Sequence, residues 1–214
     1  MWAIFVKGGP VMVPIAVLSI LGLAVVIEKA INLRLGRSIN REIVTMVEQI
    51  QAPADVPLAL RTCERYSSPF AAIIHTGLEE FHRPLSEIRQ AMEDTGRREV
   101  KRLERFMVVL ETVAAASPLL GLLGTVFGMI DVFSVISVQG VGQTGRLAGG
   151  IAQALITTAA GLSVGIPALI AFNFFDSRIG AMVVKIDAHA HELLKRIAAI
   201  KANNGVANGA NTLG

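Results

Sequence analysis

The first candidate residues for chemistry are the polar ones in a long apolar segment, residues 106–138. Glu111, Pro118 and Thr125 recur there every seven residues. On an ideal helix this spacing places them along almost one face. A carboxylate and a hydroxyl on one helix face can hold water, so this stripe is a candidate polar lining.

A second apolar segment, residues 149–175, repeats the pattern. Gln153 and Thr157 are four residues apart, and Thr158 follows directly. A threonine in a membrane helix also returns its hydrogen bond to a carbonyl one turn earlier, so each hydroxyl alone needs no functional explanation. If the two segments met around a common axis, their polar groups would form a narrow lining for water or for a partner helix.

Two carboxylates interrupt the first of these segments. Glu111 lies near its beginning and Asp131 near its end. Ionisable groups at membrane depth are costly and often functional, whereas groups at a helix end are solvated. Both interpretations stay open for each residue, and neither residue lies where a central proton carrier would.

Small residues border the polar positions in both segments. Glycine pairs spaced four residues apart let helix backbones approach closely, which makes helix packing the simplest interpretation. The packing candidates are Gly121, Gly124, Gly128, Gly161 and Gly165. Pro118 and Pro167 interrupt the helical hydrogen bonds, and we interpret both as kinks.

Other kinds of site lack support in the sequence. The four histidines are not accompanied by cysteine or carboxylate clusters at metal-ligand spacing, and the single cysteine, Cys63, rules out an intrachain disulfide. Phosphate-binding loops and nucleophile motifs are also absent. We therefore predict no catalytic residue, no metal, no cofactor and no enzymatic activity.

The elements that must position these residues are transmembrane helices. The chain of 214 residues is 52% hydrophobic and has a mean hydropathy of +0.56, too apolar for an ordinary soluble domain of this size. Three apolar runs, at 10–27, 106–138 and 149–175, are long enough to cross a hydrocarbon core. We predict an all-α membrane protein of three transmembrane helices, with long helices extending into the cytoplasm.

Basic residues set the predicted orientation. Twelve Lys and Arg residues lie between Arg34 and Arg105 and five more follow the third span, whereas the loop before that span has only Arg146. Cytoplasmic segments carry the basic excess. We predict a periplasmic N-terminus and a cytoplasmic C-terminus, and we attribute the net charge of +3 to topology rather than to nucleic-acid binding.

The charge pattern and the spans together predict the domain organisation. We expect one helix to continue from the central domain into the second span, because neither Gly nor Pro interrupts the chain after Gly96. The predicted segments are an N-terminal part with the first span (1–33), a cytoplasmic helical domain (34–105), the second span (106–138), a periplasmic loop (139–148), the third span (149–175), a cytoplasmic C-terminal helix (176–201) and a disordered tail (202–214).

Three long motifs resemble the MotA/TolQ/ExbB proton-channel family, most closely its ExbB and TolQ branch. The motifs are GGPVMVPIAVLSILGLAVVIEKA at 8–30, ASPLLGLLGTVFGMIDVF at 116–133 and GGIAQALITTAAGLSVGIPALIAFNFF at 149–175. The likeness extends over nearly the whole chain to Ile200. The three spans and the N-out topology also resemble this branch.

The resemblance implies a homopentameric ring in the bacterial inner membrane, whose second and third spans enclose a pore. It implies a single-span partner similar to ExbD or TolR that carries an intramembrane aspartate, with a TonB- or TolA-like protein as a further partner and lipid around the ring. The family's pore threonines map to Thr125 and Thr158. The implied function is that of a proton-channel or stator subunit that couples proton-motive force to outer-membrane energy transduction or biopolymer transport.

One position departs from the family pattern. Relatives have glutamate in GIAEAL, whereas this chain reads GIAQAL with Gln153. A glutamine does not titrate near neutral pH, so the resemblance implies that the partner supplies the titrating group. The alternative function, which composition leaves open, is a non-conducting membrane scaffold that assembles partner proteins.

Overall fold

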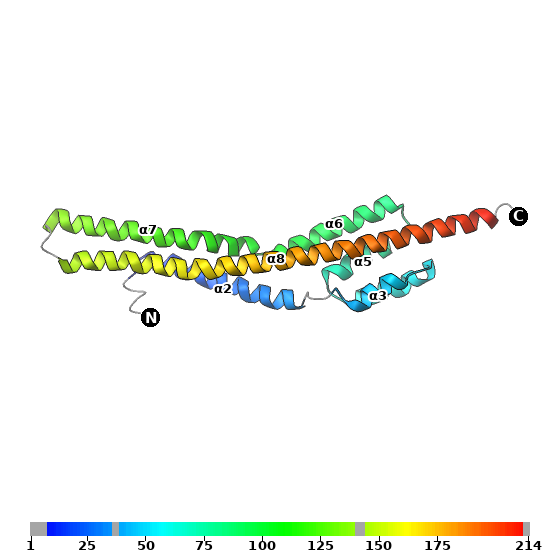
Figure 1. Cartoon of the computed structure of the whole chain (residues 1–214), viewed down its shortest axis with the longest axis horizontal. Coiled ribbons are helices and arrows are strands. Elements are labelled where there is room, and N and C mark those ends of the chain that lie inside the picture. The colour runs from blue at the N-terminus through cyan, green and yellow to red at the C-terminus, as the bar shows by residue number, and fades with distance from the viewer. Residues whose placement is uncertain (1–7, 36–38, 140–143, 212–214) are drawn as a thin grey trace. The chain divides into compact units, whose positions relative to one another are not determined.

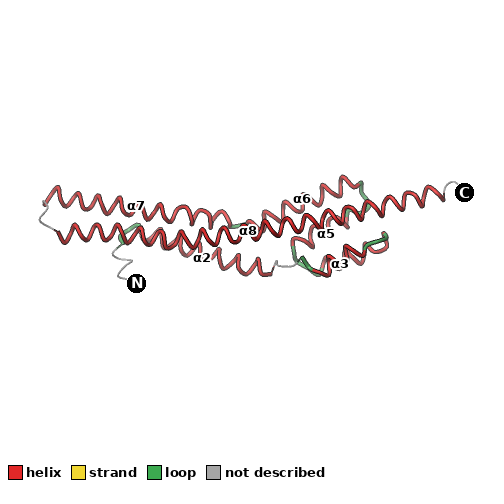
Figure 2. Tube along the Cα trace, viewed as in Figure 1, coloured by secondary structure: helices red, strands yellow, loops and turns green. Residues whose placement is uncertain are grey.

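The computed structural model describes residues 8–35, 39–139 and 144–211, which consist of helices joined by turns and loops (Figure 1, Figure 2). No strand occurs in these ranges, which confirms the predicted all-α class. Parts of the predicted N-terminal segment (1–7), central domain (36–38), loop (140–143) and tail (212–214) lie outside the described residues. The helices are α2 (Met12–Leu35), α3 (Arg41–Gln49), the short 3₁₀ turn η1 (Pro53–Asp55), α4 (Val56–Glu64), α5 (Pro69–Glu79), α6 (Leu85–Glu104), α7 (Met107–Gln139) and α8 (Thr144–Asn211).

Three of the helical stretches are long and apolar enough to cross a membrane, and each overlaps one of the three predicted spans. α7 alone has 33 residues, which at 1.5 Å per residue is about 50 Å. The ring assembly stays a prediction.

The chain divides into two compact units. We call Met1–Ile31 with Phe106–Asp176 the membrane unit, and Asn32–Arg105 with Ser177–Gly214 the charged unit. α8 supplies residues to both.

Large apolar side chains cover the outer surface of the membrane unit. Such side chains are normal for a helix whose solvent is hydrocarbon, because lipid imposes no penalty on their exposure. Those at least half exposed in α2, α7 and α8 include Val13, Val17, Ile20, Leu23, Ile27, Leu119, Leu122, Ile130, Phe133, Leu155, Ile166, Leu169, Ile170 and Phe174. Many of the buried positions in α7 and the first part of α8 are instead small residues, such as Ser117, Gly121, Gly124, Ala154 and Gly161.

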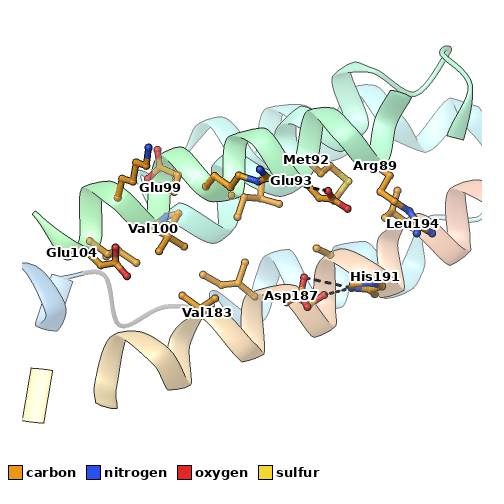
Figure 3. A pocket seen from close by; sticks show the side chains of 18 residues that line it. Arg89, Met92, Glu93, Glu99, Val100, Glu104, Val183, Asp187, His191 and Leu194 are labelled. Atoms are coloured by element: carbon orange, nitrogen blue, oxygen red, sulfur yellow. Dashed lines mark hydrogen bonds and ion pairs between the residues drawn. The ribbon is translucent and has the colours of Figure 1, made fainter. Parts of the chain in front are cut away.

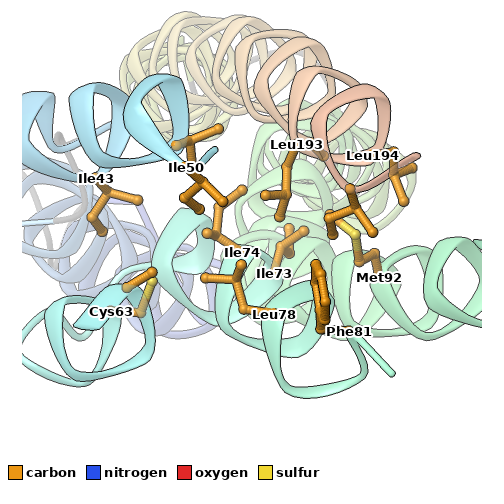
Figure 4. Close-up of a cluster of buried hydrophobic side chains, with 14 of the residues drawn as sticks. Ile43, Ile50, Cys63, Ile73, Ile74, Leu78, Phe81, Met92, Leu193 and Leu194 are labelled. Carbon is orange, nitrogen blue, oxygen red and sulfur yellow. The ribbon is translucent and has the colours of Figure 1, made fainter. Parts of the chain in front are cut away.

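The charged unit has a conventional hydrophobic core (Figure 4). α3 places Ile43 and Val47 in it, α5 places Phe70 and Ile74 in it, and α6 contributes Ile88. α8 supplies a stripe at helical spacing, as expected of an amphipathic helix packed on one side. The stripe consists of Ile186, Ala190, Leu193, Leu194, Ile197 and Ile200.

Polar caps fix the starts of two helices in this unit. The Asn40 side chain accepts a hydrogen bond from the Glu42 backbone N–H at the start of α3. At the start of α5, the Ser68 hydroxyl accepts from the Ala71 N–H, and Pro69 occupies the first helical position. These are preferred residue types for those positions.

The expectation of one helix running through Gly96 into the second span is wrong. α6 ends at Glu104 and α7 begins at Met107, because Arg105 has an extended ψ of 133° and Phe106 has a left-handed φ of 68°. The Phe106 carbonyl then accepts from the N–H groups of Val109 and Leu110, which starts α7. A left-handed conformation is rare for a bulky residue, and the local sequence carries no Gly or Pro signal for the break.

The end of the chain also differs from the expectation. α8 continues to Asn211, through most of the segment 202–214 that we expected to be disordered. Each residue added to an existing helix gains a hydrogen bond without a new nucleation cost. This helix therefore does not end where the apolar stripe ends.

Candidate functional site

The candidate site is the contact between α7 and the first part of α8, where the predicted glycines and threonines meet. A Cβ atom on Gly124 would lie 2.5 Å from Cβ of Thr157 and 2.9 Å from its Cγ2. A Cβ on Gly121 would lie 3.0 Å from the Thr157 carbonyl oxygen, and one on Gly128 would lie 2.8 Å from the Gly150 carbonyl oxygen. Only glycine fits at these separations, so the α7 glycines set how closely the helices approach.

The glycines of α8 make the reciprocal contacts. A Cβ on Gly161 would overlap the Ser117 carbonyl oxygen and lie 3.0 Å from Cα of Gly121. A Cβ on Gly165 would lie 2.7 Å from the Pro118 ring. All five predicted packing glycines therefore lie at one helix–helix contact, and Pro118 packs against the last of them.

The two neighbouring threonines of α8 have different surroundings. Thr157 has 0% of its surface exposed, and its hydroxyl donates to the Ala154 carbonyl at 2.8 Å and to the Gln153 carbonyl at 3.2 Å. The Thr158 hydroxyl is half-buried and donates across the helix contact to the Gly121 carbonyl at 3.2 Å. Burial favours packing over the predicted pore-lining role for Thr157, whereas Thr158 keeps a partly open surface.

The polar residues of α7 lie in a less enclosed environment. The half-buried Thr125 donates its hydroxyl to the Leu122 carbonyl of its own helix at 2.6 Å. Glu111 and Asp131 are exposed in the single chain. The three residues of the stripe, Glu111, Pro118 and Thr125, therefore have different surroundings, because Pro118 at its centre faces α8.

Gln153 contacts the segment that precedes α2. A Cβ on Gly9 would overlap the amide nitrogen of Gln153 and lie 3.2 Å from its Cδ atom. Gly9 has a φ of 72°, a left-handed conformation that favours glycine. The Gln153 side chain is half-buried in this position.

Two buried polar residues of the membrane unit were not singled out from the sequence. Ser117 is 0% exposed and donates its hydroxyl to the Val113 carbonyl at 2.7 Å. Its spacing of four residues before Gly121 marks it as a small residue in the packing stripe. Lys29 is only 2% exposed, with Nζ 3.6 Å from Oε2 of Glu28. Its place in a basic flank gave no signal that it would be buried.

The charged unit contains a cavity of about 830 Å³ between α6, α8 and the start of α5 (Figure 3). Apolar residues such as Met92, Val100 and Leu194 form part of its lining, and charges of both signs accompany them. On α8, Nδ1 of His191 lies 3.5 Å from Oδ1 of Asp187. None of the lining residues is a serine or cysteine, so this cavity offers no side-chain nucleophile of those types.

The histidines do not form a metal site in the part of the chain that the structure describes. His75 lies between two carboxylates, with Nε2 3.9 Å from Glu64 and Nδ1 3.5 Å from Glu79. The ring of His189 packs against Phe70, with 5.5 Å between ring centroids. These contacts are compatible with ordinary surface and core-edge positions.

A model of the MotA/TolQ/ExbB proton channel family matches residues 65–188, from the end of α4 to the middle of α8. The chain belongs to this family. The matched range contains all of α7 and the whole α7–α8 contact described above. The resemblance inferred from the motifs is therefore confirmed.

Individual relatives support the same family assignment. "Putative biopolymer transport protein ExbB-like 1" of Synechocystis is 36% identical over 174 residues, which cover 79% of this chain and 68% of that protein. "Biopolymer transport protein ExbB" of Neisseria meningitidis serogroup A is 30% identical over 91% of this chain and 95% of its own length. The Xanthomonas campestris protein of the same name is 40% identical over 50% of this chain, but that match spans only 42% of the relative.

Family membership decides the class of the protein. The family is one of proton channels and not of enzymes, which confirms the prediction that this chain is not an enzyme. Together with three apolar helices, it makes the chain a multi-pass protein of the bacterial inner membrane. The orientation of the termini stays a prediction.

Proposed function

We propose that this chain is the proton-channel subunit of an inner-membrane motor of the ExbB–ExbD or TolQ–TolR type. Such a motor couples proton-motive force to outer-membrane energy transduction or biopolymer transport. The family match over residues 65–188 carries the proposal, because it includes both helices that bear the candidate threonines. The biopolymer-transport names of the relatives support it.

The proposed assembly is a membrane complex with several copies of this chain. Five copies form a ring, with α7 and the first part of α8 toward the centre. A single-span ExbD- or TolR-like partner brings an intramembrane aspartate into that centre, and a TonB- or TolA-like protein receives the motion. The N-terminus lies in the periplasm and the charged unit in the cytoplasm, as the distribution of basic residues predicts.

Thr125 and Thr158 are the residues proposed to support proton movement. Each hydroxyl already donates its hydrogen to a backbone carbonyl, at Leu122 and Gly121 respectively. A hydroxyl that has used its donor still has acceptor capacity, so it can receive a hydrogen bond from water or from a protonated carboxyl. Glu111, being exposed near the start of α7, is a candidate for the entrance rather than for the centre of the pathway.

The first experiment is native mass spectrometry of the full chain, expressed with its genomic neighbours and extracted in mild detergent. Five copies with a single-span, aspartate-bearing partner support the proposal. A monomer or dimer without such a partner favours the non-conducting scaffold. Replacing the partner's aspartate by asparagine should abolish energised function while the complex still assembles.

The second experiment tests the hydroxyls. Thr125→Val and Thr158→Val preserve side-chain shape while removing the acceptor, so each should abolish energised function with the oligomer intact. Thr112→Val is the matched control, because the exposed Thr112 also donates to its own helix, at the Val108 carbonyl 2.8 Å away. Normal energised function in both test variants would remove the proposed roles of Thr125 and Thr158.

A further inference from the structure

The segment that leads into α2 and the first turn of that helix are closely packed. Val11, Met12 and Ile15 are 6%, 7% and 3% exposed, whereas Val17 and Ile20 farther along are 50% and 69% exposed. This end contacts the first part of α8, because Ile156 lies next to Gly8 and Gln153 next to Gly9. Two glycines immediately before α2 show where that contact is made.

Gly8 and Gly9 have close neighbours on α8. A Cβ on Gly8 would lie 3.4 Å from Cγ2 of Ile156 and 2.7 Å from Sδ of Met12. A Cβ on Gly9 would overlap Nε2 of Gln153. The Gln153 side chain therefore extends over the Gly9 backbone and occupies the space that a side chain on residue 9 would need.

The turn itself is fixed by backbone hydrogen bonds. The Met12 N–H donates to the Gly9 carbonyl at 3.1 Å, and the Val13 N–H donates to the Pro10 carbonyl at 3.2 Å. The left-handed φ of 72° at Gly9 sets the direction in which the chain enters α2. Only the absence of a Cβ allows this conformation and the approach of Gln153 together.

From these contacts we propose that Gln153 is a positioning residue that anchors the N-terminal turn of α2 to α8. The anchor makes the start of the first span and the start of the third span one body. Its importance for a motor rests on the proposed function, since it would stop the first span from sliding along α8 while a partner moves. An uncharged amide makes the anchor independent of pH.

Hydrogen exchange of the purified full-length complex tests the anchor. In Gln153→Ala the amide exchange of Met12 and Val13 should rise about tenfold, as expected when one packing contact holding a helix end is lost. Gln153→Met, which keeps the length of the side chain, should retain most of the protection. Gly149→Ala is the control on α8, because a Cβ there meets nothing within 4 Å, and it should leave the exchange of the turn unchanged.

A second pair of variants tests the contact from the other side. Gly9→Asn tolerates the left-handed φ better than most residues, but its Cβ displaces the Gln153 amide, so exchange of the turn should rise. Combining it with Gln153→Ala should raise exchange by less than the product of the two single effects, as expected for residues in direct contact. Gly9→Asn by itself also tests the anchor if Gln153→Ala fails to fold.

The anchor is overturned if exchange in Gln153→Ala stays within twofold of the wild type, or if the two substitutions act independently. The measurement needs no proton gradient and no energised assay. Failure of the motor proposal, such as the absence of an aspartate-bearing partner, would therefore leave this test valid, and failure of the anchor would not contradict the motor.

Discussion

Replacing Gly124 by alanine would place a methyl group into the contact between α7 and α8. The new Cβ would lie 2.5 Å from Cβ of Thr157 and 2.9 Å from its Cγ2, far inside ordinary van der Waals contact. Thr157 cannot yield easily, because it is fully buried and its hydroxyl donates to two carbonyls of its own helix. Its β-branched side chain also has few alternative rotamers. The helices must therefore separate.

The size of the effect follows from two opposing terms. Overpacking a closely packed site costs about 1–3 kcal/mol. Alanine in place of glycine inside a helix gains about 0.8–1.0 kcal/mol. The net effect of Gly124→Ala should be a loss of about 0–2 kcal/mol. Gly149→Ala, where the new methyl group meets open space, should instead gain up to about 1 kcal/mol.

The assay is unfolding of the purified chain in mild detergent by titration with a denaturing detergent, followed by circular dichroism. Gly124→Ala should unfold earlier than Gly149→Ala by an amount that corresponds to about 1–3 kcal/mol. Adding Thr157→Gly removes the side chain that the new methyl group meets. The double variant should then be more stable than the sum of the two single effects.

Two results would refute this reasoning. If Gly124→Ala stabilises the chain as much as Gly149→Ala does, α7 and α8 are farther apart at Gly124 than in the structure. If Thr157→Gly and Gly124→Ala act additively, the two residues do not meet. Either result would also weaken the assignment of Thr157 to packing.

Two further predictions concern the charged unit. Burial raises the pKa of the Cys63 thiol to about 11, so only about one thiol in a thousand is the reactive thiolate at pH 8. Maleimide should therefore label Cys63 in the denatured chain and not in the folded chain. Rapid labelling of the folded chain would contradict the burial of Cys63. The guanidinium of Arg196 donates from Nη1 to the Glu48 carbonyl at the end of α3 at 2.6 Å, so Arg196→Ala should lower the free energy of unfolding by about 1 kcal/mol. Thermal unfolding measures this loss, with Lys195→Ala, a substitution of an exposed neighbour, as the control. Equal melting temperatures for the two variants would show that the contact contributes nothing to stability.

The spans and the helical class could be predicted from the sequence because they depend on composition alone. An apolar run such as 149–175 can satisfy its backbone in lipid only as a helix. The same argument could not reveal the break at Phe106. That break depends on two backbone angles, and the residues around it, with neither Gly nor Pro among them, carry no local signal for a helix end.

The packing glycines were also predictable, because a spacing of four residues places small residues on one helix face. Gly124 and Gly128 on α7, and Gly161 and Gly165 on α8, all lie at the same contact. The sequence could not say which face of each helix meets the other. That information requires the rotation of each helix about its own axis, which side-chain contacts decide.

The two threonines at 157 and 158 show why this rotation matters for the proposed mechanism. Consecutive residues on a helix point about 100° apart, so only one of them can face directly into a given contact. Gly124 leaves room for Thr157, and this fit turns the neighbouring Thr158 toward the edge of the contact, where its hydroxyl reaches the Gly121 carbonyl. The packing of one threonine thereby places the other at a partly open position. A substitution that alters the fit at Gly124 should consequently impair proton movement through Thr158, even though it leaves that hydroxyl in place.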